Sequence, residues 1–141
     1  MRNNKIIISI IIFYLFFFQK ITFADVFKFE TSEIQILNNG KTIKAINGGK
    51  ASTKDNVEIF ADVFEYEKEA NSLIADGNVK LIDKDNQLII KTKKIIYLKN
   101  EEKILINNKM NAIVSNKYNI DSEKIVYDRK KKVIQAEKKT I

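Results

Sequence analysis

The stretch FADVFEYEKEANSLIADGNVKL, residues 60–81, carries the pattern that decides the fold. Apolar side chains alternate at Val57, Ile59 and Ala61, and after a slip of one position the alternation resumes at Phe64 and Tyr66. A spacing of two puts side chains on one face of a β-strand, and a slip in that spacing marks a bulge or a bend. The segment is therefore predicted to form a strand that bends just after Ala61.

A second strand is predicted after a turn at residues 67–71. Its alternate positions place Leu73, Ala75, Val79 and Leu81 on one face. Clusters of Asn, Gly and Asp favour turns, and they separate the apolar stretches along the chain. These clusters are Asn38-Asn39-Gly40, Asn47-Gly48-Gly49, Asp55-Asn56, Asp76-Gly77-Asn78, Asn107-Asn108 and Asn116. Because no stretch after Thr22 keeps a helical period, the rest of the chain is predicted to be all-β.

The same pattern recurs about every 30 residues. Tyr66, Tyr97 and Tyr127 are 31 and 30 residues apart, and Ile36 precedes the first of them by 30. Other apolar positions keep similar offsets: Phe27, Val57, Leu88 and Tyr118; Phe29, Ile59, Ile90 and Ile120; Ile34, Phe64, Ile95 and Ile125; Ile43, Leu73, Ile104 and Ile134; Ala45, Ala75, Ile106 and Ala136. The position at the expected bend holds a small or hydroxyl-bearing residue in each unit: Thr31, Ala61, Thr92 and Ser122.

A repeated unit with one apolar face cannot bury that face alone, so its copies must stack. Residues 25–141 are therefore predicted to form one domain of about four 30-residue units, the last of them incomplete. Two architectures satisfy the pattern: a narrow solenoid filled with side chains, and an open sheet folded over an apolar groove. An incomplete last unit is expected to leave an unpaired edge strand.

The N-terminus carries the pattern of a secretory signal peptide. Basic residues among the first five precede an apolar run at residues 6–18. Secretory signals need roughly 7–15 apolar residues, whereas a membrane-spanning helix needs about 20. Thr22 and Ala24 then supply the small residues that precede a cleavage site. Residues 1–24 are predicted to be a cleaved signal helix, and an uncleaved anchor over residues 6–23 is the alternative.

The composition excludes several classes of function. The chain has no His and no Cys, so imidazole and thiolate metal sites and nucleophiles paired with His are excluded. We expect no enzyme activity, no cofactor and no metal. The net charge is +7, and it falls to +4, with 22 basic residues against 18 acidic, when residues 1–24 are removed. Because the basic residues are spread along the chain, no nucleic-acid partner is expected.

Short runs of like charge are predicted to be solvated turns. The basic run at residues 129–132 is one of them. The acidic pairs Asp83 with Asp85 and Glu101 with Glu102 are two others, because neither has an evident pocket or basic partner in the sequence.

The segments Phe60-Ala61-Asp62-Val63-Phe64-Glu65-Tyr66 and Ile74-Ala75-Asp76-Gly77-Asn78-Val79-Lys80-Leu81 resemble a known family. The pattern A-D-x-[apolar]-x-Y followed by A-x-G-N-V is similar to the OstA-like periplasmic domain of lipopolysaccharide transport (Lpt) proteins. The resemblance covers residues 25–141 and is strongest from Ile59 to Leu81. It is weaker in the third unit, where Asn107-Asn108-Lys109-Met110 replaces Asp-Gly-Asn-Val.

The resemblance implies a folded-over β-taco or β-jellyroll sheet in the periplasm of a Gram-negative cell, and it allows association with the outer membrane. It implies a bridge component whose partners are lipopolysaccharide and other Lpt domains, joined head to tail by strand addition. The expected lipid lining is Ile59, Ala61, Phe64, Tyr66, Leu73, Ala75, Ile90, Ile95, Tyr97, Ile104, Ile106, Ile120, Ile125 and Tyr127.

Two alternatives to the bridge component remain open from the sequence. In one, the chain is the N-terminal periplasmic domain of an outer-membrane lipopolysaccharide assembly protein. In the other, it is a β-solenoid scaffold that binds no lipid.

Overall fold

The computed structural model describes residues 26–136, and the proposed signal peptide lies outside the described residues. This part of the chain forms one antiparallel sheet of eleven strands with a single short 3-10 turn, η1 (Asn38–Gly40). The strands are β1 (Lys28–Leu37), β2 (Thr42–Ser52), β3 (Val57–Ala61), β4 (Val63–Glu67), β5 (Ser72–Asp83), β6 (Leu88–Leu98), β7 (Lys103–Ile106), β8 (Met110–Val114), β9 (Tyr118–Ser122), β10 (Ile125–Asp128) and β11 (Val133–Ala136). The all-β prediction is confirmed.

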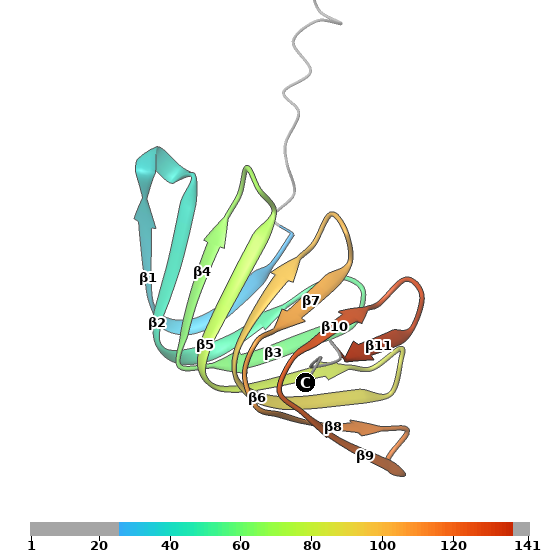
Figure 1. Ribbon diagram of the computed structural model, residues 1–141. Coiled ribbons are helices and arrows are strands. Elements are labelled where there is room, and N and C mark those ends of the chain that lie inside the picture. The colour runs from blue at the N-terminus through green and yellow to red at the C-terminus, as the bar shows by residue number, and fades with distance from the viewer. Residues whose placement is uncertain (1–25, 137–141) are drawn as a thin grey trace, which may run out of the picture.

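The sheet is folded over along a crease, as the sequence predicted (Figure 1). The β3 wall comprises residues 28–31 of β1, 49–52 of β2, 79–83 of β5 and 88–92 of β6, together with β3, β8 and β9. The β4 wall comprises residues 33–37 of β1, 42–46 of β2, 72–76 of β5 and 94–98 of β6, together with β4, β7, β10 and β11. Strands β1, β2, β5 and β6 run through the crease and join the two walls.

The crease is built from bulges. Register shifts fall between Thr31 and Glu33 and between Asp76 and Val79, and Asp62 separates β3 from β4. The Asp62 N–H donates to the Gly77 carbonyl at 2.9 Å. Thr31 Oγ1 lies 3.0 and 2.8 Å from the backbone carbonyl oxygens of Ile46 and Gly48, so its single hydroxyl proton is donated to one of these carbonyls or shared between them at the bulge.

Two of the clusters interpreted as turn signals lie at bulges inside strands, and the strand predicted from Leu73 to Leu81 is confirmed through the second of them. Asn47-Gly48-Gly49 lies inside β2 and Asp76-Gly77-Asn78 lies inside β5, both at the crease. Four of these residues have φ between +49° and +80°. This conformation suits Asn and Gly in bulges as well as in turns, so composition alone does not separate a bend within a strand from a turn that ends one.

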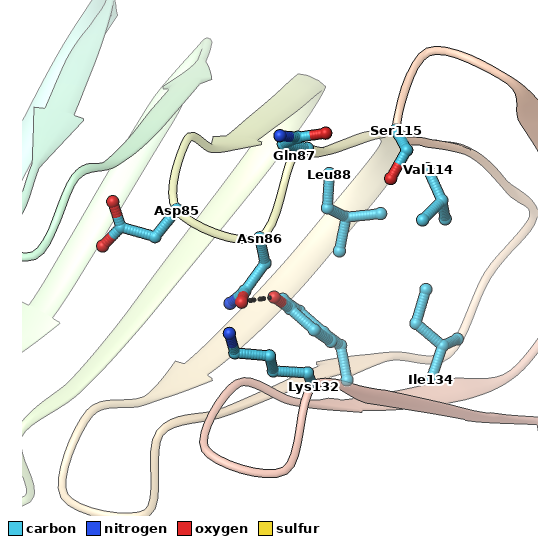
Figure 2. Close-up of a pocket in the computed structure, with 9 residues that line it drawn as sticks. Asp85, Asn86, Gln87, Leu88, Val114, Ser115, Lys132 and Ile134 are labelled. Carbon is cyan, nitrogen blue, oxygen red and sulfur yellow. Dashed lines mark hydrogen bonds between the residues drawn. The ribbon is translucent and has the colours of Figure 1, made fainter.

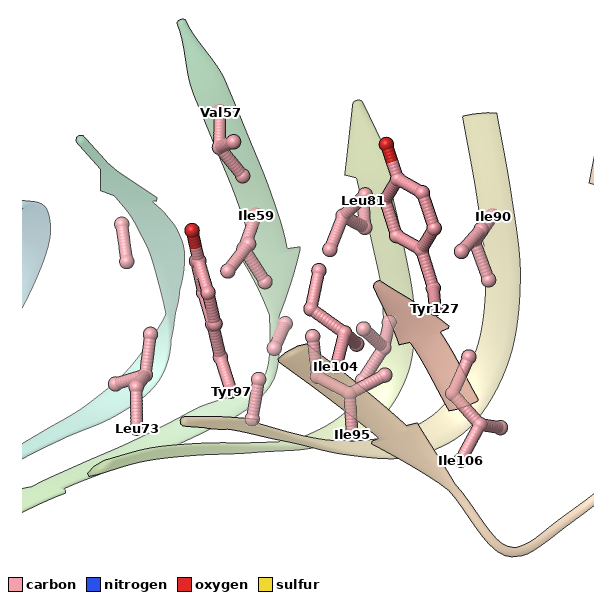
Figure 3. Packing of buried hydrophobic residues seen from close by; sticks show 14 of the residues in the cluster. Val57, Ile59, Leu73, Leu81, Ile90, Ile95, Tyr97, Ile104, Ile106 and Tyr127 are labelled. Carbon is pink, nitrogen blue, oxygen red and sulfur yellow. The ribbon is translucent and has the colours of Figure 1, made fainter. Parts of the chain in front are cut away.

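The apolar faces of the two walls pack on each other and form one core (Figure 3). The largest fully buried side chains include Phe64, Ile59, Leu81, Ile104 and Tyr97. Aromatic rings close the N-terminal end of this core, where Phe27 packs edge-on against Tyr66 and Tyr97 with centroid distances of 5.1 and 5.7 Å. The space between the walls is therefore filled with side chains.

Candidate lipid-binding interior

The inner face of the β4 wall carries a continuous row of apolar and Tyr side chains across eight strand segments. Strand pairing places in register, in this order, Ile36, Ile43, Tyr66, Leu73, Tyr97, Ile104, Tyr127 and Ile134. Residues about 30 positions apart in the sequence thus become next-but-one neighbours across the sheet. The spacing of the tyrosines therefore corresponds to a row that runs perpendicular to the strands.

Two further rows face the interior. One lies on the β4 wall nearer the crease, and the other lies on the β3 wall. On the β4 wall, Ile34, Ala45, Phe64, Ala75 and Ile95 are paired in order, and Ile106, Ile125 and Ala136 are paired in order beyond them. On the β3 wall the row is Phe29, Ala51, Ile59, Leu81, Ile90, Ala112 and Ile120. Small Ala side chains alternate with large ones in parts of each row, which allows opposing walls to interdigitate.

Of the fourteen residues expected to line a groove, thirteen are buried in the core, and Ile120 is 37% exposed at the C-terminal end of the β3 wall. The structure brings the thirteen together in one cluster, which also contains Phe27, Val57, Val79, Leu88 and Met110. In the closed molecule these side chains contact each other. A lipid chain would reach them only if the walls moved apart.

Apolar side chains are exposed at the two ends of the folded sheet. Ile34 and Ile36 on β1 are 48% and 69% exposed, and Tyr118 and Ile120 on β9 are exposed at the other end. Strands β1, β9 and β11 each pair with a single neighbour among the described residues. These strands are therefore edges with free backbone hydrogen-bonding groups.

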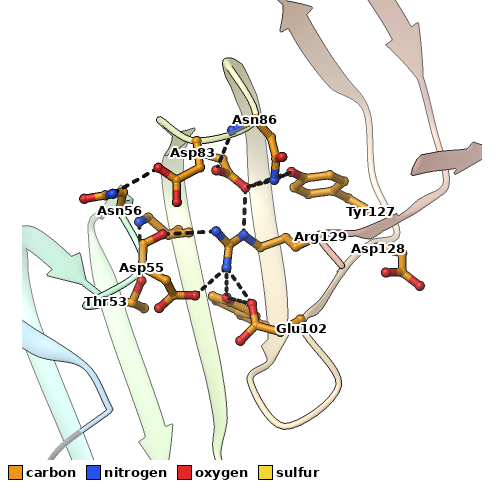
Figure 4. A network of polar contacts seen from close by, with 12 residues as sticks. Thr53, Asp55, Asn56, Asp83, Asn86, Glu102, Tyr127, Asp128 and Arg129 are labelled. Carbon is orange, nitrogen blue, oxygen red and sulfur yellow. Dashed lines mark hydrogen bonds and ion pairs between the residues drawn. The ribbon is translucent and has the colours of Figure 1, made fainter. Parts of the chain in front are cut away.

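A polar cluster joins the walls along the edges opposite the crease (Figure 4). We call this group the edge cluster: Asp55, Asp83 and Asn86 come from the β3 wall and its turns, and Tyr97, Lys99, Glu102, Tyr127 and Arg129 come from the β4 wall and its turns. Arg129 Nε donates to Asp83 Oδ2 at 2.7 Å, and Arg129 Nη1 donates to Asp55 Oδ2 at 2.6 Å and to Glu102 Oε2 at 2.5 Å.

Asp83 is the most buried charged group in the cluster. Its side chain has no accessible surface, and that of Arg129 is 7% exposed. The Tyr127 hydroxyl donates to Asp83 Oδ2 at 2.7 Å, and Asn86 donates to both carboxylate oxygens of Asp83. A buried carboxylate is tolerated when it is paired and fully hydrogen-bonded, and Asp83 meets both conditions.

The surroundings shift the pKa values of the acidic groups downward. Burial alone would raise the pKa of Asp83, but hydrogen bonds from Arg129, Tyr127 and Asn86 outweigh it, and the pKa lies below its ordinary value. Burial also opposes ionisation of Asp55, and hydrogen bonds from Lys99 and Arg129 overcome it, so its pKa is strongly lowered. Both carboxylates therefore stay ionised at neutral pH.

Burial and the neighbouring carboxylates raise the pKa values of the two tyrosines in the cluster. The Tyr97 hydroxyl donates to Glu102 Oε2 at 2.8 Å, and the Tyr127 hydroxyl donates to Asp83. The Tyr66 hydroxyl donates to Asn71 Oδ1 at 2.6 Å. These hydroxyls are engaged in protein contacts in the closed molecule.

The expectation that the charge runs are solvated turns is wrong for three residues. Asp83, Glu102 and Arg129 lie within the edge cluster rather than in solvent. Arg129 is separated from Asp83 by 46 residues and from Asp55 by 74. The 30-residue repeat aligns apolar positions, but it does not indicate which charged residues meet across the fold.

A cavity of about 330 Å³ lies beside the edge cluster, between the two walls (Figure 2). Leu88 and Val114 from the β3 wall and Ile134 from the β4 wall supply its apolar lining, and Lys132 and Asn86 add polar groups. Asn86 Oδ1 is buried and has no hydrogen-bond partner among residues 26–136. The cavity is thus an amphipathic opening at the free edges of the walls.

Within residues 26–136, no group of three or more acidic side chains is placed to hold a metal ion. In the same part of the chain, no helix has the length and apolar character needed to cross a membrane.

The fold is similar to the crystal structure of LptH from Pseudomonas aeruginosa, described as the LptA-homologous periplasmic component of the conserved lipopolysaccharide transport device. The TM-score is 0.68 and the sequence identity is 13%, over 78% of this chain and 80% of that one. No protein-family model matches the chain, and no curated protein gives a significant match. The likeness confirms the β-jellyroll fold that the sequence resemblance implied.

Proposed function

We propose that this protein is a periplasmic bridge component that binds lipopolysaccharide between its walls and carries it toward the outer membrane. The observation that carries the proposal is the folded sheet itself. Its inner rows are apolar from strand to strand, and its architecture is shared with LptH, a component of a lipopolysaccharide transport device.

Continuous inner rows suit an acyl chain that must move. Burying each CH2 group is worth about 0.8 kcal/mol, so several chains held between the walls would be strongly retained against water. Because Leu73, Ile104 and Ile134 offer similar surfaces along the row, displacement from one to the next changes that energy little. Retention and movement are therefore compatible in this interior.

The ends of the sheet are suited to joining similar domains head to tail. Edge strands offer unpaired backbone groups to a strand of another domain, and exposed Ile34, Ile36 and Ile120 extend the inner rows to both ends. Strand addition at β1, β9 or β11 would make these rows continuous between neighbouring domains. Other Lpt periplasmic domains are the proposed partners.

Site-specific cross-linking tests the proposed lipid binding. A photoreactive amino acid is introduced at Ile95 or Phe64, both buried in the core, and the purified protein is irradiated with lipopolysaccharide. A covalent adduct from these positions is expected, and an equivalent substitution at exposed Phe60 serves as the control. An absence of adducts from both core positions, with the folded state intact, would overturn the proposal.

A scaffold that binds no lipid is the second candidate. It is favoured by the packed interior, in which thirteen of the expected lining residues contact each other rather than a groove. Mass spectrometry of the protein purified from membranes separates the two candidates. Lipid retained in stoichiometric amounts supports the conduit, whereas lipid-free protein that also fails to cross-link supports the scaffold.

A further inference from the structure

The edge cluster links parts of the two walls that the backbone leaves separate. At the crease, β1, β2, β5 and β6 pass continuously from one wall to the other. At the opposite edges the strands end in turns, and side chains make the connection. Lys99 and Arg129 of the β4 wall both contact Asp55, with Lys99 Nζ 2.8 Å from Asp55 Oδ2, and Arg129 also contacts Asp83.

The strands bend at the crease through bulges that contain glycine. Gly48 and Gly77 adopt φ values of +76° and +80° at the bulges where the strands bend. A Cβ atom on Gly77 would lie 2.3 Å from Asp62 Oδ2, so this close approach depends on glycine. Bulges lack a regular ladder and absorb changes in bend more readily than paired strand segments.

The ion pairs and hydrogen bonds of the edge cluster can break and form again. A buried ion pair is often no more stabilising than apolar side chains of similar volume, because desolvation offsets the attraction. An apolar contact between the edges would cover the core equally well. Unlike an apolar contact, an ion pair can be replaced by contacts of each charged group with water or with other charged groups. Side chains of the cluster border a second cavity of about 360 Å³ lined by Asp55, Glu102, Arg129 and Lys130 among others, so the cross-wall contacts lie beside open space.

We propose that the edge cluster is a latch, and that breaking its cross-wall contacts lets the two walls part at their free edges while they stay joined at the crease. The latch regulates the entry of lipid acyl chains to the interior. This part of the inference rests on the proposed function. Opening exposes the residues nearest the edges first. Without lipid, the lining next to the crease stays covered until the whole domain unfolds, and acyl chains that enter between the parted edges reach it only by spreading the walls further.

Single cysteines test the latch, because the chain has none of its own. Val57 is buried at the edge, next to Asp83 in the sheet, and Ala75 is buried near the crease. Cys is a small and mostly apolar replacement at both positions. The rate at which N-ethylmaleimide modifies Val57→Cys and Ala75→Cys is measured under native conditions, without lipid.

The latch is weakened by Asp83→Asn together with Arg129→Met, which deletes its buried ion pair without leaving a lone buried ion, while the ion pair between Lys99 and Asp55 remains. We expect modification of Val57→Cys to accelerate about tenfold or more, as for a local opening that costs less than global unfolding, while Ala75→Cys keeps its rate. Lys84→Gln, which removes an ion pair with Glu58 within the β3 wall, is the matched control and should change neither rate.

Equal acceleration at both reporters would overturn the latch, because it would show that the cluster only stabilises the domain. Unchanged rates at both reporters would overturn it as well. Should the double variant not fold, Asp55→Asn removes the partly exposed partner of Lys99 and Arg129, and the same difference between reporters is required. Since no lipid is present, failure here is distinct from failure of lipopolysaccharide cross-linking.

Discussion

Arg129 of the β4 wall and Asp83 of the β3 wall form a buried ion pair, with 2.7 Å between Arg129 Nε and Asp83 Oδ2. The two residues are 46 positions apart in the sequence. Their contact joins the walls at the edge where, in the described part of the chain, no strand connects them. The two walls are thus joined by continuous strands at the crease and by charged side chains at the opposite edge.

Arg129→Met is expected to destabilise the protein by about 3–5 kcal/mol, because Asp83 would remain charged and buried without its cation. Adding Asp83→Asn to Arg129→Met should restore part of this loss, since the uncompensated charge is then gone. Urea unfolding of the wild type and the two variants measures both effects. A double variant no more stable than Arg129→Met would contradict the buried-charge explanation.

Acid is expected to weaken the domain through Asp55 and Asp83. Both pKa values are lower in the folded state than in the unfolded chain, so the unfolded state binds protons first as the pH falls. The stability they contribute is present above about pH 4 and is lost progressively below it. Thermal unfolding between pH 7 and pH 3 tests this, and a smaller pH dependence is expected for Asp83→Asn. An unfolding temperature that stays constant over this range would contradict the prediction.

Gly77→Ala is expected to cost about 2 kcal/mol or more, because Gly77 has φ +80° and its new Cβ would meet the Asp62 side chain. Gly40→Ala is the matched control. Gly40 has φ +86°, but apart from its chain neighbours no atom of the described residues lies within 4 Å of the place where a Cβ would be added, so only the conformational cost of about 1 kcal/mol applies. Chemical denaturation compares the two, and equal losses would show that the crease tolerates the extra atom.

Much of the fold follows from residues whose signal is local. The alternation through Ile59 and Phe64 identifies the strands, and the slip after Ala61 locates the bend that separates β3 from β4. The 31-residue spacing of Tyr66 and Tyr97 corresponds to next-but-one places in one row of the sheet, with Leu73 between them. Periodicity is sufficient for these features, because alternation over a few consecutive residues identifies each strand and the recurrence of that pattern identifies the repeat.

Two features do not follow from the sequence. One is whether the interior is an open groove or a packed core, and the other is which charged residues pair in the edge cluster. Burial of Ile95 or Leu73 is expected both for a groove and for a packed core, because each requires the same apolar residues. Asp83 and Arg129 look like ordinary turn residues until the fold brings them together. Their pairing depends on how far each wall extends, which alternation does not encode.

The proposed head-to-tail association is expected to depend on the exposed end of β1. Ile36→Lys places a charge on the exposed inner row at this edge and should shift self-association to at least about tenfold higher protein concentration, as for loss of roughly 1.4 kcal/mol of contact energy. Phe60→Lys, at an exposed position on β3, is the control. Light scattering across a concentration series makes the comparison. Loss of association in the Phe60 variant alone would place the contact elsewhere.

Lipopolysaccharide cross-linking from Ile95 in the wild type and in the Asp83→Asn, Arg129→Met variant is the most direct test of lipid carriage between the walls. Ile95 has no accessible surface in the closed domain, so an adduct there requires lipid to have entered the interior. We expect an adduct in the wild type and a higher yield in the variant. Adducts formed only from exposed positions such as Phe60, with none from Ile95 in either protein, would contradict lipid carriage between the walls.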